Sequence, residues 1–168
     1  MTAGGTGSVE ERLQRLEDVE EIRRLDAVYC RLIDDGDWSA LVDLFTADGV
    51  FDGLSRVAGR SDLLTFFSGL VTGGLTAFWH HVSNLEVEVS GDVATVRSLL
   101  WQPCVVDGVP HVAAGRYTDE LVRTAGGWRY RVKQVRFSYW APLTVGWDQH
   151  RFSLEAARAA AVPRGVHP

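Results

Sequence analysis

The chain has 168 residues, of which 46% are hydrophobic and 23% charged, and its net charge is −5. This length is typical of one globular domain whose core can enclose a ligand-sized hollow. The acidic balance argues against a nucleic-acid surface, which usually carries a basic stripe, and no apolar run reaches the roughly 18 residues of a membrane span. Cys30 and Cys104 are too few for a disulfide framework or a cysteine zinc site.

A long N-terminal helix is the first predicted element. Ser8 and Glu11 have the spacing of a capping box. Apolar side chains then recur at intervals of three and four through residues 9–33, which predicts a single apolar stripe along one helix. The run Asp34-Asp35-Gly36-Asp37 ends this helix, because Gly36 suits the left-handed position after a last turn.

Two shorter helices and a strand are expected next. Asp37 can cap a helix over residues 38–45. Residues 49–53 predict a short strand between glycines, and a third helix is expected to open at Ser61 or Asp62.

The second half of the chain predicts β-strands. Four β-rich runs cover residues 78–89, 93–106, 111–123 and 128–140, and short glycine-containing turns separate the last three. Such turns are typical of an antiparallel meander. We therefore expect an α+β fold in which a strongly curved, mostly antiparallel sheet packs on three helices.

The chain is expected to divide into a tail over residues 1–7, one domain over 8–150, and a short helix with a tail over 151–168. Its start lacks the basic-then-apolar layout of a signal peptide, so we expect a cytoplasmic protein.

Alternation along the last strand places a charged residue on the apolar face. The even-numbered residues of 128–140 are mostly apolar and include Arg136, whereas the odd-numbered ones include Arg129, Arg131 and Lys133. We therefore expect Arg136 to face inward and Lys133 to face solvent. An inward guanidinium needs a partner, which is either a core carboxylate or an anionic or carbonyl oxygen in a pocket.

Three other positions are candidates for acid/base chemistry. Asp34 lies in the last helical turn, where the helix dipole raises the pKa of a carboxyl group and favours a role as base or as histidine partner, although turn aspartates often serve only as caps. Tyr29 lies on the apolar stripe, so its buried hydroxyl either serves the core or donates to a substrate. His80 and His81 point to opposite sides of a strand. Alternation favours His81 as the inward residue, and a bulge before Leu85 would reverse this.

Signatures of other chemistries are missing from the sequence. It contains no glycine-rich phosphate loop and no Gly-x-Ser-x-Gly turn, and its histidines lack the spacing of metal ligands. We therefore expect no metal and no cofactor, and a cofactor-independent acid/base site is the class that fits.

Several short motifs, taken in order, resemble the SnoaL-like branch of the NTF2-like superfamily. They are Tyr29, Asp34-Asp35-Gly36-Asp37-Trp38, Asp48-Gly49-Val50-Phe51, His80-His81-Val82-Ser83-Asn84, Gly91-Asp92-Val93-Ala94-Thr95 and Gly115-Arg116-Tyr117-Thr118-Asp119. The resemblance extends from about residue 9 to 140. It implies a cone of three helices wrapped by a curved sheet, assembled as a homodimer or homotrimer.

Within this branch, the N-terminal half is most similar to the bile-acid 7α-dehydratases and more distantly to the scytalone dehydratases. By position, the resemblance implies catalytic roles for Tyr29, Asp34, His80 and Arg136, and it selects the first of the two adjacent histidines. Where the bile-acid enzymes carry a second catalytic aspartate, this chain has Gln102.

The resemblance and the residues together predict a cofactor-independent lyase or isomerase, dehydratase- or cyclase-like, that acts on a hydrophobic, oxygenated, steroid- or polyketide-like molecule. His80, paired with Asp34, takes a proton and Tyr29 donates one. The alternative is a non-catalytic module for small-molecule binding or dimerisation. We expect no nucleic-acid or membrane partner. The expected substrate contacts are Phe51, Trp101, Gln102 and Trp140.

Overall fold

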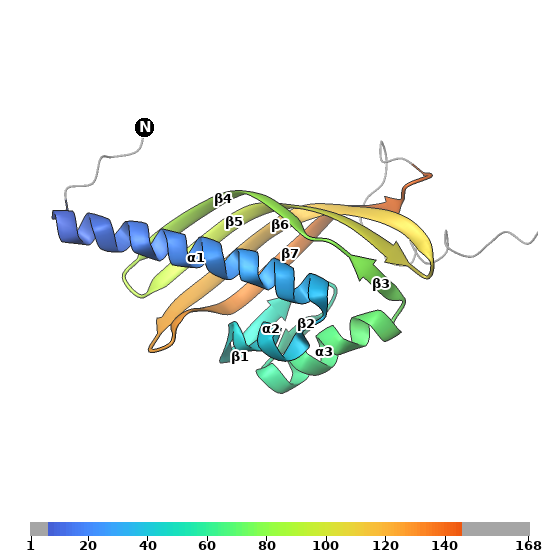
Figure 1. Ribbon diagram of the computed structural model, residues 1–168, viewed down its shortest axis with the longest axis horizontal. Coiled ribbons are helices and arrows are strands. Elements are labelled where there is room, and N and C mark those ends of the chain that lie inside the picture. Colours follow the sequence, from blue (N-terminus) through green and yellow to red (C-terminus); the bar gives the residue numbers. More distant parts are fainter. Residues whose placement is uncertain (1–6, 146–168) are drawn as a thin grey trace, which may run out of the picture.

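The computed structural model describes residues 7–145, so the helix expected within residues 151–168 lies outside the described residues. Three helices lie against one curved, seven-stranded sheet (Figure 1). The helices are α1 (Val9–Asp35), α2 (Trp38–Asp43) and α3 (Arg60–Thr72). The strands are β1 (Phe45–Asp52), β2 (Arg56–Ala58), β3 (Leu75–Phe78), β4 (His81–Ser90), β5 (Val93–Val106), β6 (Val109–Thr124) and β7 (Gly127–Pro142).

The sheet has the order β2-β1-β7-β6-β5-β3, and β4 also pairs with β5. Strands β5, β6 and β7 form the predicted antiparallel meander. Among the described strands, β1 and β7 alone pair in parallel. The expected α+β cone with a mostly antiparallel sheet is therefore confirmed. No helix within residues 7–145 is long and apolar enough to cross a membrane.

The elements differ from the sequence predictions at several places. β1 begins at Phe45 and not at Gly49, and β2 was not predicted. The strand expected over residues 78–89 is two strands, β3 and β4, which share β5 as partner. The second helix ends at Asp43, because Phe45 already pairs with Tyr130 as the start of β1. The third helix begins at Arg60, with Gly59 at its N-cap.

The predicted caps of α1 are present. The Ser8 hydroxyl accepts from the Glu11 amide at 3.2 Å, and the Glu11 carboxylate accepts from the Ser8 amide at 2.8 Å. Gly36 follows the helix with a φ of 74°, in the left-handed region that glycine adopts without strain.

The predicted single apolar stripe is wrong for the N-terminal half of α1. Val9, Leu13 and Leu16 are 71%, 55% and 68% exposed, whereas Asp18 is buried against the sheet. From Ile22 onward the apolar residues do face the core. The intervals of three and four persist along the helix, but the face that they mark rotates around it.

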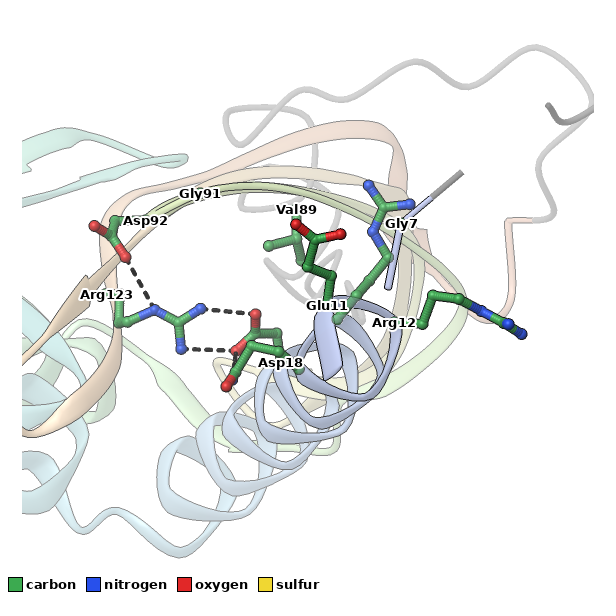
Figure 2. Close-up of a pocket in the computed structure, with 10 residues that line it drawn as sticks. Gly7, Glu11, Arg12, Asp18, Val89, Gly91, Asp92 and Arg123 are labelled. Carbon is green, nitrogen blue, oxygen red and sulfur yellow. Dashed lines mark hydrogen bonds and ion pairs between the residues drawn. The ribbon is translucent and has the colours of Figure 1, made fainter. Parts of the chain in front are cut away.

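An ion pair between the buried Asp18 and the partly exposed Arg123 ties this half of α1 to the sheet. Arg123 on β6 lies 2.7 Å from Asp18 and 3.1 Å from Asp92. Figure 2 shows the Arg123 side chain between these two carboxylates. The Arg123 guanidinium also lies over the Trp128 ring, 4.6 Å from its centroid. Asp18, Asp92 and Arg123 border an open pocket of about 870 Å³ between α1 and the β4–β5 turn. The Arg123 hydrogen bond holds the pKa of Asp18 below its usual value.

We expect Asp18→Asn to reduce the acid sensitivity of the fold. Because the folded-state pKa of Asp18 is lowered, its stabilising effect is present above the unfolded pKa of about 3.9 and is lost as pH falls through the folded value. Thermal unfolding at pH 7, 5 and 2.5 should therefore show a smaller acid-induced loss in this variant than in wild type. Asp35→Asn, whose side chain is 61% exposed, is the control. An unchanged acid profile in Asp18→Asn would contradict the assignment.

Strand β7 carries two irregularities that reset its alternation. The register against β6 skips Arg131 and, further along, Ser138. Each skipped residue shifts the inward positions by one. As a result, the predicted alternation is wrong after Arg131: Lys133 is fully buried and Arg136 faces solvent.

At the second irregularity, Gly115 lets β6 approach β7 closely. A Cβ at residue 115 would lie 2.6 Å from the backbone oxygen of Arg136. We expect Gly115→Ala to lower the free energy of unfolding by about 1–3 kcal/mol, measured by urea denaturation. The control is Gly69→Ala within α3, where a Cβ meets nothing within 4 Å and a gain of about 0.5–1 kcal/mol is expected. Equal stability of the two variants would argue against a close approach at Gly115.

Candidate active site

Asp34, at the end of α1, and His80, between β3 and β4, form a short hydrogen-bonded pair. The His80 Nδ1 atom lies 2.6 Å from Oδ1 of Asp34, and the His80 amide donates to Oδ2 at 2.9 Å. The His80 side chain is 5% exposed and the Asp34 side chain 20%. One carboxylate therefore fixes both the backbone and the ring of residue 80. The predicted pairing of these two residues is confirmed.

A bulge in β4 decides which of the two adjacent histidines belongs to the site. The register against β5 shifts between Ser83 and Glu86, and Asn84 has a φ of 55°. The strand therefore changes its inward parity after the histidines, so that His81 is exposed while the ring of His80 is turned inward. The bulge that the resemblance implied is present.

His80 borders a small cavity inside the cone. Its volume is about 30 Å³, which is the share of one water molecule in the liquid. Three of the expected substrate contacts, Phe51, Gln102 and Trp140, line this cavity. The fourth, Trp101, lies outside this cavity and is 43% exposed, because it precedes Gln102 on β5 and neighbouring residues of a strand point to opposite faces. Most of the remaining lining is apolar and comprises Ile33, Leu54, Phe66, Phe67, Leu70, Leu75, Phe78, Val135 and Phe137.

Tyr29 reaches the same cavity from α1 and is fully buried. Its ring packs edge-on against Phe45 and Tyr130. Its hydroxyl has no hydrogen-bond partner among residues 7–145, and burial raises its pKa far above the usual value of a tyrosine. An unmade hydrogen bond of a buried group costs about 1–3 kcal/mol. A ligand with an acceptor oxygen at this position would recover it.

A buried lysine, which strand alternation had assigned to the surface, lies behind Tyr29. The Lys133 ammonium lies 2.8 Å from Asp119 and 3.2 Å from Asp26. It also sits 4.2 to 4.5 Å from the ring centroids of three tyrosines, which are Tyr29, Tyr117 and Tyr130.

The ionisation of this cluster reflects burial and charge pairing. Burial raises the pKa of Asp119 to about 6. Burial also opposes the charge on Lys133, but Asp119 and Asp26 outweigh it and hold the lysine pKa above its usual value. Lys133 is the only lysine among the 17 basic residues of the sequence, a feature from which no role was predicted.

Arg136 lies outside the cavity, so its predicted inward position was wrong. The Arg131 bulge places its side chain on the outer face, where it is 58% exposed and binds Asp52 at 2.8 Å. The Arg136 hydrogen bond lowers the pKa of Asp52. The structure thus brings Tyr29, Asp34 and His80 together and leaves Arg136 on the surface.

Comparison with known proteins identifies the family. A model of the SnoaL-like domain matches residues 14–133. The chain belongs to the SnoaL-like family. The resemblance of its motifs to the SnoaL-like branch is therefore confirmed, whereas the closer similarity to bile-acid dehydratases stays a prediction.

Three relatives illustrate the extent of the similarity. The uncharacterized protein Rv2910c of Mycobacterium tuberculosis (strain ATCC 25618 / H37Rv) is 31% identical over 119 residues, which are 68% of this chain and 81% of the relative. The structure of an NTF2-like protein with a cystatin-like fold from Novosphingobium aromaticivorans is 31% identical, with a TM-score of 0.63 and coverage of 92% and 97%. A hexachlorocyclohexane dehydrochlorinase, LinA-type3 from Novosphingobium barchaimii LL02, is 22% identical, with a TM-score of 0.72 and coverage of 84% and 98%, and shares the fold.

Two further hollows of this SnoaL-like domain adjoin the cavity. A pocket of about 520 Å³ lies between α1 and β4 and is bordered by His80, Asp26 and Cys30. A groove of about 340 Å³ lies along α3. This groove and the cavity share wall residues, which are Leu54, Phe66, Leu70, Leu75 and Trp140.

The cysteines and the other polar residues do not form a metal centre in the described part of the SnoaL-like domain. No group of three or more His, Cys, Asp or Glu side chains with metal-binding geometry occurs within residues 7–145. Burial raises the pKa of Cys30 and of Cys104 to about 12. Both thiols are therefore protonated at neutral pH and act as packing groups.

Proposed function

We propose that this SnoaL-like protein is a cofactor-independent lyase or isomerase of a hydrophobic, oxygenated small molecule, in which His80 and Asp34 form the base. The observation that carries the proposal is the 2.6 Å contact between His80 and Asp34 at the wall of an apolar cavity. General bases of this kind contribute about 10²–10⁴-fold to a rate.

Asp34 sets the proton arrangement of the imidazole. A carboxylate at Nδ1 favours the tautomer that carries its proton there, which leaves the lone pair of Nε2 to accept a proton from substrate. The charge that then develops on the ring is balanced by the Asp34 carboxylate. His80 would remove a proton next to a carbonyl group, which starts either an elimination or a double-bond shift.

Tyr29 is the proposed proton donor. Its unpartnered hydroxyl, within the same cavity, can bond to a carbonyl or a departing hydroxyl oxygen of the substrate. The Lys133 ammonium, 4.3 Å from the centre of the Tyr29 ring, favours negative charge developing on the phenol. Gln102 can orient the substrate by hydrogen bonding but does not exchange protons near neutral pH.

The groove along α3 is the proposed entry route. The cavity alone has about 30 Å³, too little for an organic substrate. Rotation of Phe66 and Leu70, which separate the cavity from the 340 Å³ groove, would join the two spaces. The joined space would have the size and the largely apolar lining of a small-molecule site.

An elimination reaction has a precedent in another protein that has this fold. The LinA-type relative is named for a dehydrochlorination, which is an elimination reaction. In this chain we propose a dehydration or a double-bond shift of a polycyclic or polyketide-like compound, with cyclisation as a further outcome of the same proton transfer.

The experiment is deuterium exchange with a panel of hydrophobic ketones and β-hydroxy ketones. The protein is incubated with each compound in D₂O, and ¹H NMR follows loss of the proton next to the carbonyl and appearance of an alkene. Enzyme-dependent exchange is the expected result. The small cavity favours one other candidate, a non-catalytic binding module. Compounds that bind without exchange would support that candidate and overturn the proposed activity.

A further inference from the structure

The N-terminal half of α1 carries an apolar face that the rest of residues 7–145 does not cover. Figure 1 shows the first turns of α1 projecting beyond the end of the sheet. Val9, Leu13 and Leu16 are 71%, 55% and 68% exposed on this segment. These three large apolar side chains are thus exposed to solvent within two helical turns. Most other apolar residues of the described helices pack inward.

The spacing of these residues is that of a short coiled-coil seam. Val9, Leu13 and Leu16 are separated by four and three residues, which matches positions d, a and d of a heptad. Asp18 then occupies position f, opposite the seam, and it is the residue that the domain buries through Arg123. The domain therefore anchors α1 by the side of the helix that a coiled-coil partner would leave free.

The charges beside the seam select the partner and its direction. In this heptad Arg12 is at position g and Glu17 at position e of the next heptad. A parallel pair brings g of one helix to the following e of the other, so Arg12 would meet Glu17 of a second copy on both sides of the seam. An antiparallel pair would instead bring arginine to arginine and glutamate to glutamate. Both side chains are exposed, and no ion pair involves either of them among the described residues.

We propose that the N-terminal half of α1 pairs in parallel with the same segment of a second copy of this chain. The seam ends at Glu20, where a charged residue takes the next a position and binds Arg24 of its own helix at 3.3 Å. The seam from Val9 to Leu16 is little more than one heptad long and buries less surface than a standard interface, so the dimer is reversible and depends on concentration.

Sedimentation velocity across a concentration series tests whether the seam of Val9, Leu13 and Leu16 forms the dimer contact. Leu13→Glu is expected to weaken dimerisation at least tenfold while far-UV circular dichroism stays unchanged, because Leu13 lies outside the core. The matched control is Leu99→Glu, whose site on β5 is 40% exposed. Dimerisation that is lost in Leu99→Glu and kept in Leu13→Glu would overturn the proposal in favour of the sheet face. A chain that is monomeric at every concentration would overturn the proposal as well.

Charge exchange and cross-linking test the parallel direction. Arg12→Glu and Glu17→Arg should each weaken the dimer, and the double variant should restore it. In a background with Cys30→Ser and Cys104→Ser, Leu13→Cys should form a disulfide dimer on mild oxidation, since facing a positions meet in a parallel pair. Arg97→Cys on β5 is the control and should stay reduced. Failure of the double variant to restore dimerisation, together with absent Leu13→Cys cross-linking, would reject the parallel arrangement.

Discussion

Lys133→Met is expected to lower the free energy of unfolding by about 3–5 kcal/mol, since it removes one partner from a fully buried charge cluster. The ammonium binds Asp119 and Asp26, and a methionine of similar length would leave both carboxylates buried without their cation. The loss comes from the uncompensated charges and not from a cavity, because the two side chains are of similar volume.

Urea denaturation at pH 7 measures this effect. Arg131→Met, two residues earlier on the same strand, is the matched control: its exposed ion pair with Glu120 should be worth less than about 1 kcal/mol. Adding Asp26→Asn and Asp119→Asn to Lys133→Met should restore part of the stability, because the variant then buries no unpaired charge. A loss below 1 kcal/mol in Lys133→Met alone would show that the cluster does not depend on the lysine charge.

His80→Ala is expected to reduce turnover by about 10²–10⁴-fold with any substrate that the wild-type protein converts, while ligand binding is retained. Asp34→Asn should also lower turnover, because an amide cannot balance the charge of an imidazolium. Initial rates and ligand affinity, measured in parallel for each variant, separate the chemical step from binding.

The neighbouring histidine supplies the control for this prediction. His81→Ala changes an exposed side chain on the same strand, so it should leave both turnover and affinity near wild type. Turnover that survives in His80→Ala would remove the histidine from the mechanism and leave Tyr29 as the sole candidate for proton transfer.

The sequence predicted those parts of the fold that depend on local signals. The capping box of Ser8, the left-handed Gly36 and the glycine turns of the meander each act within a few residues, and all are present. Alternation alone did not decide whether His80 or His81 faces inward. The Asp34–His80 pair was predicted because the resemblance selected His80 and so implied a bulge in this strand.

The errors come from features that are set by contacts between distant segments. The register skip at Arg131 depends on how β7 pairs with β6. It places Lys133 on the inner face of the sheet and Arg136 on the outer face, the reverse of the prediction. Asp18 lies on the inner side of α1, where it binds Arg123, a residue 105 positions away in sequence. Periodicity records which residues share a face, but it does not record where the partner strand adds or omits a residue.

The parallel pairing of β1 with β7 sets an order on folding. Asp52 and Gln134, which face each other across this pair, are 82 residues apart in sequence. The hairpins of the meander join residues much closer together, so their loop-closure entropy is smaller and they can form earlier. During synthesis, β1 is made before β7, so the parallel pairing of β1 cannot form until β7 has been made. Until then one edge of β1 stays unpaired, and an unpaired strand edge is the kind of surface on which chaperones and aggregation compete.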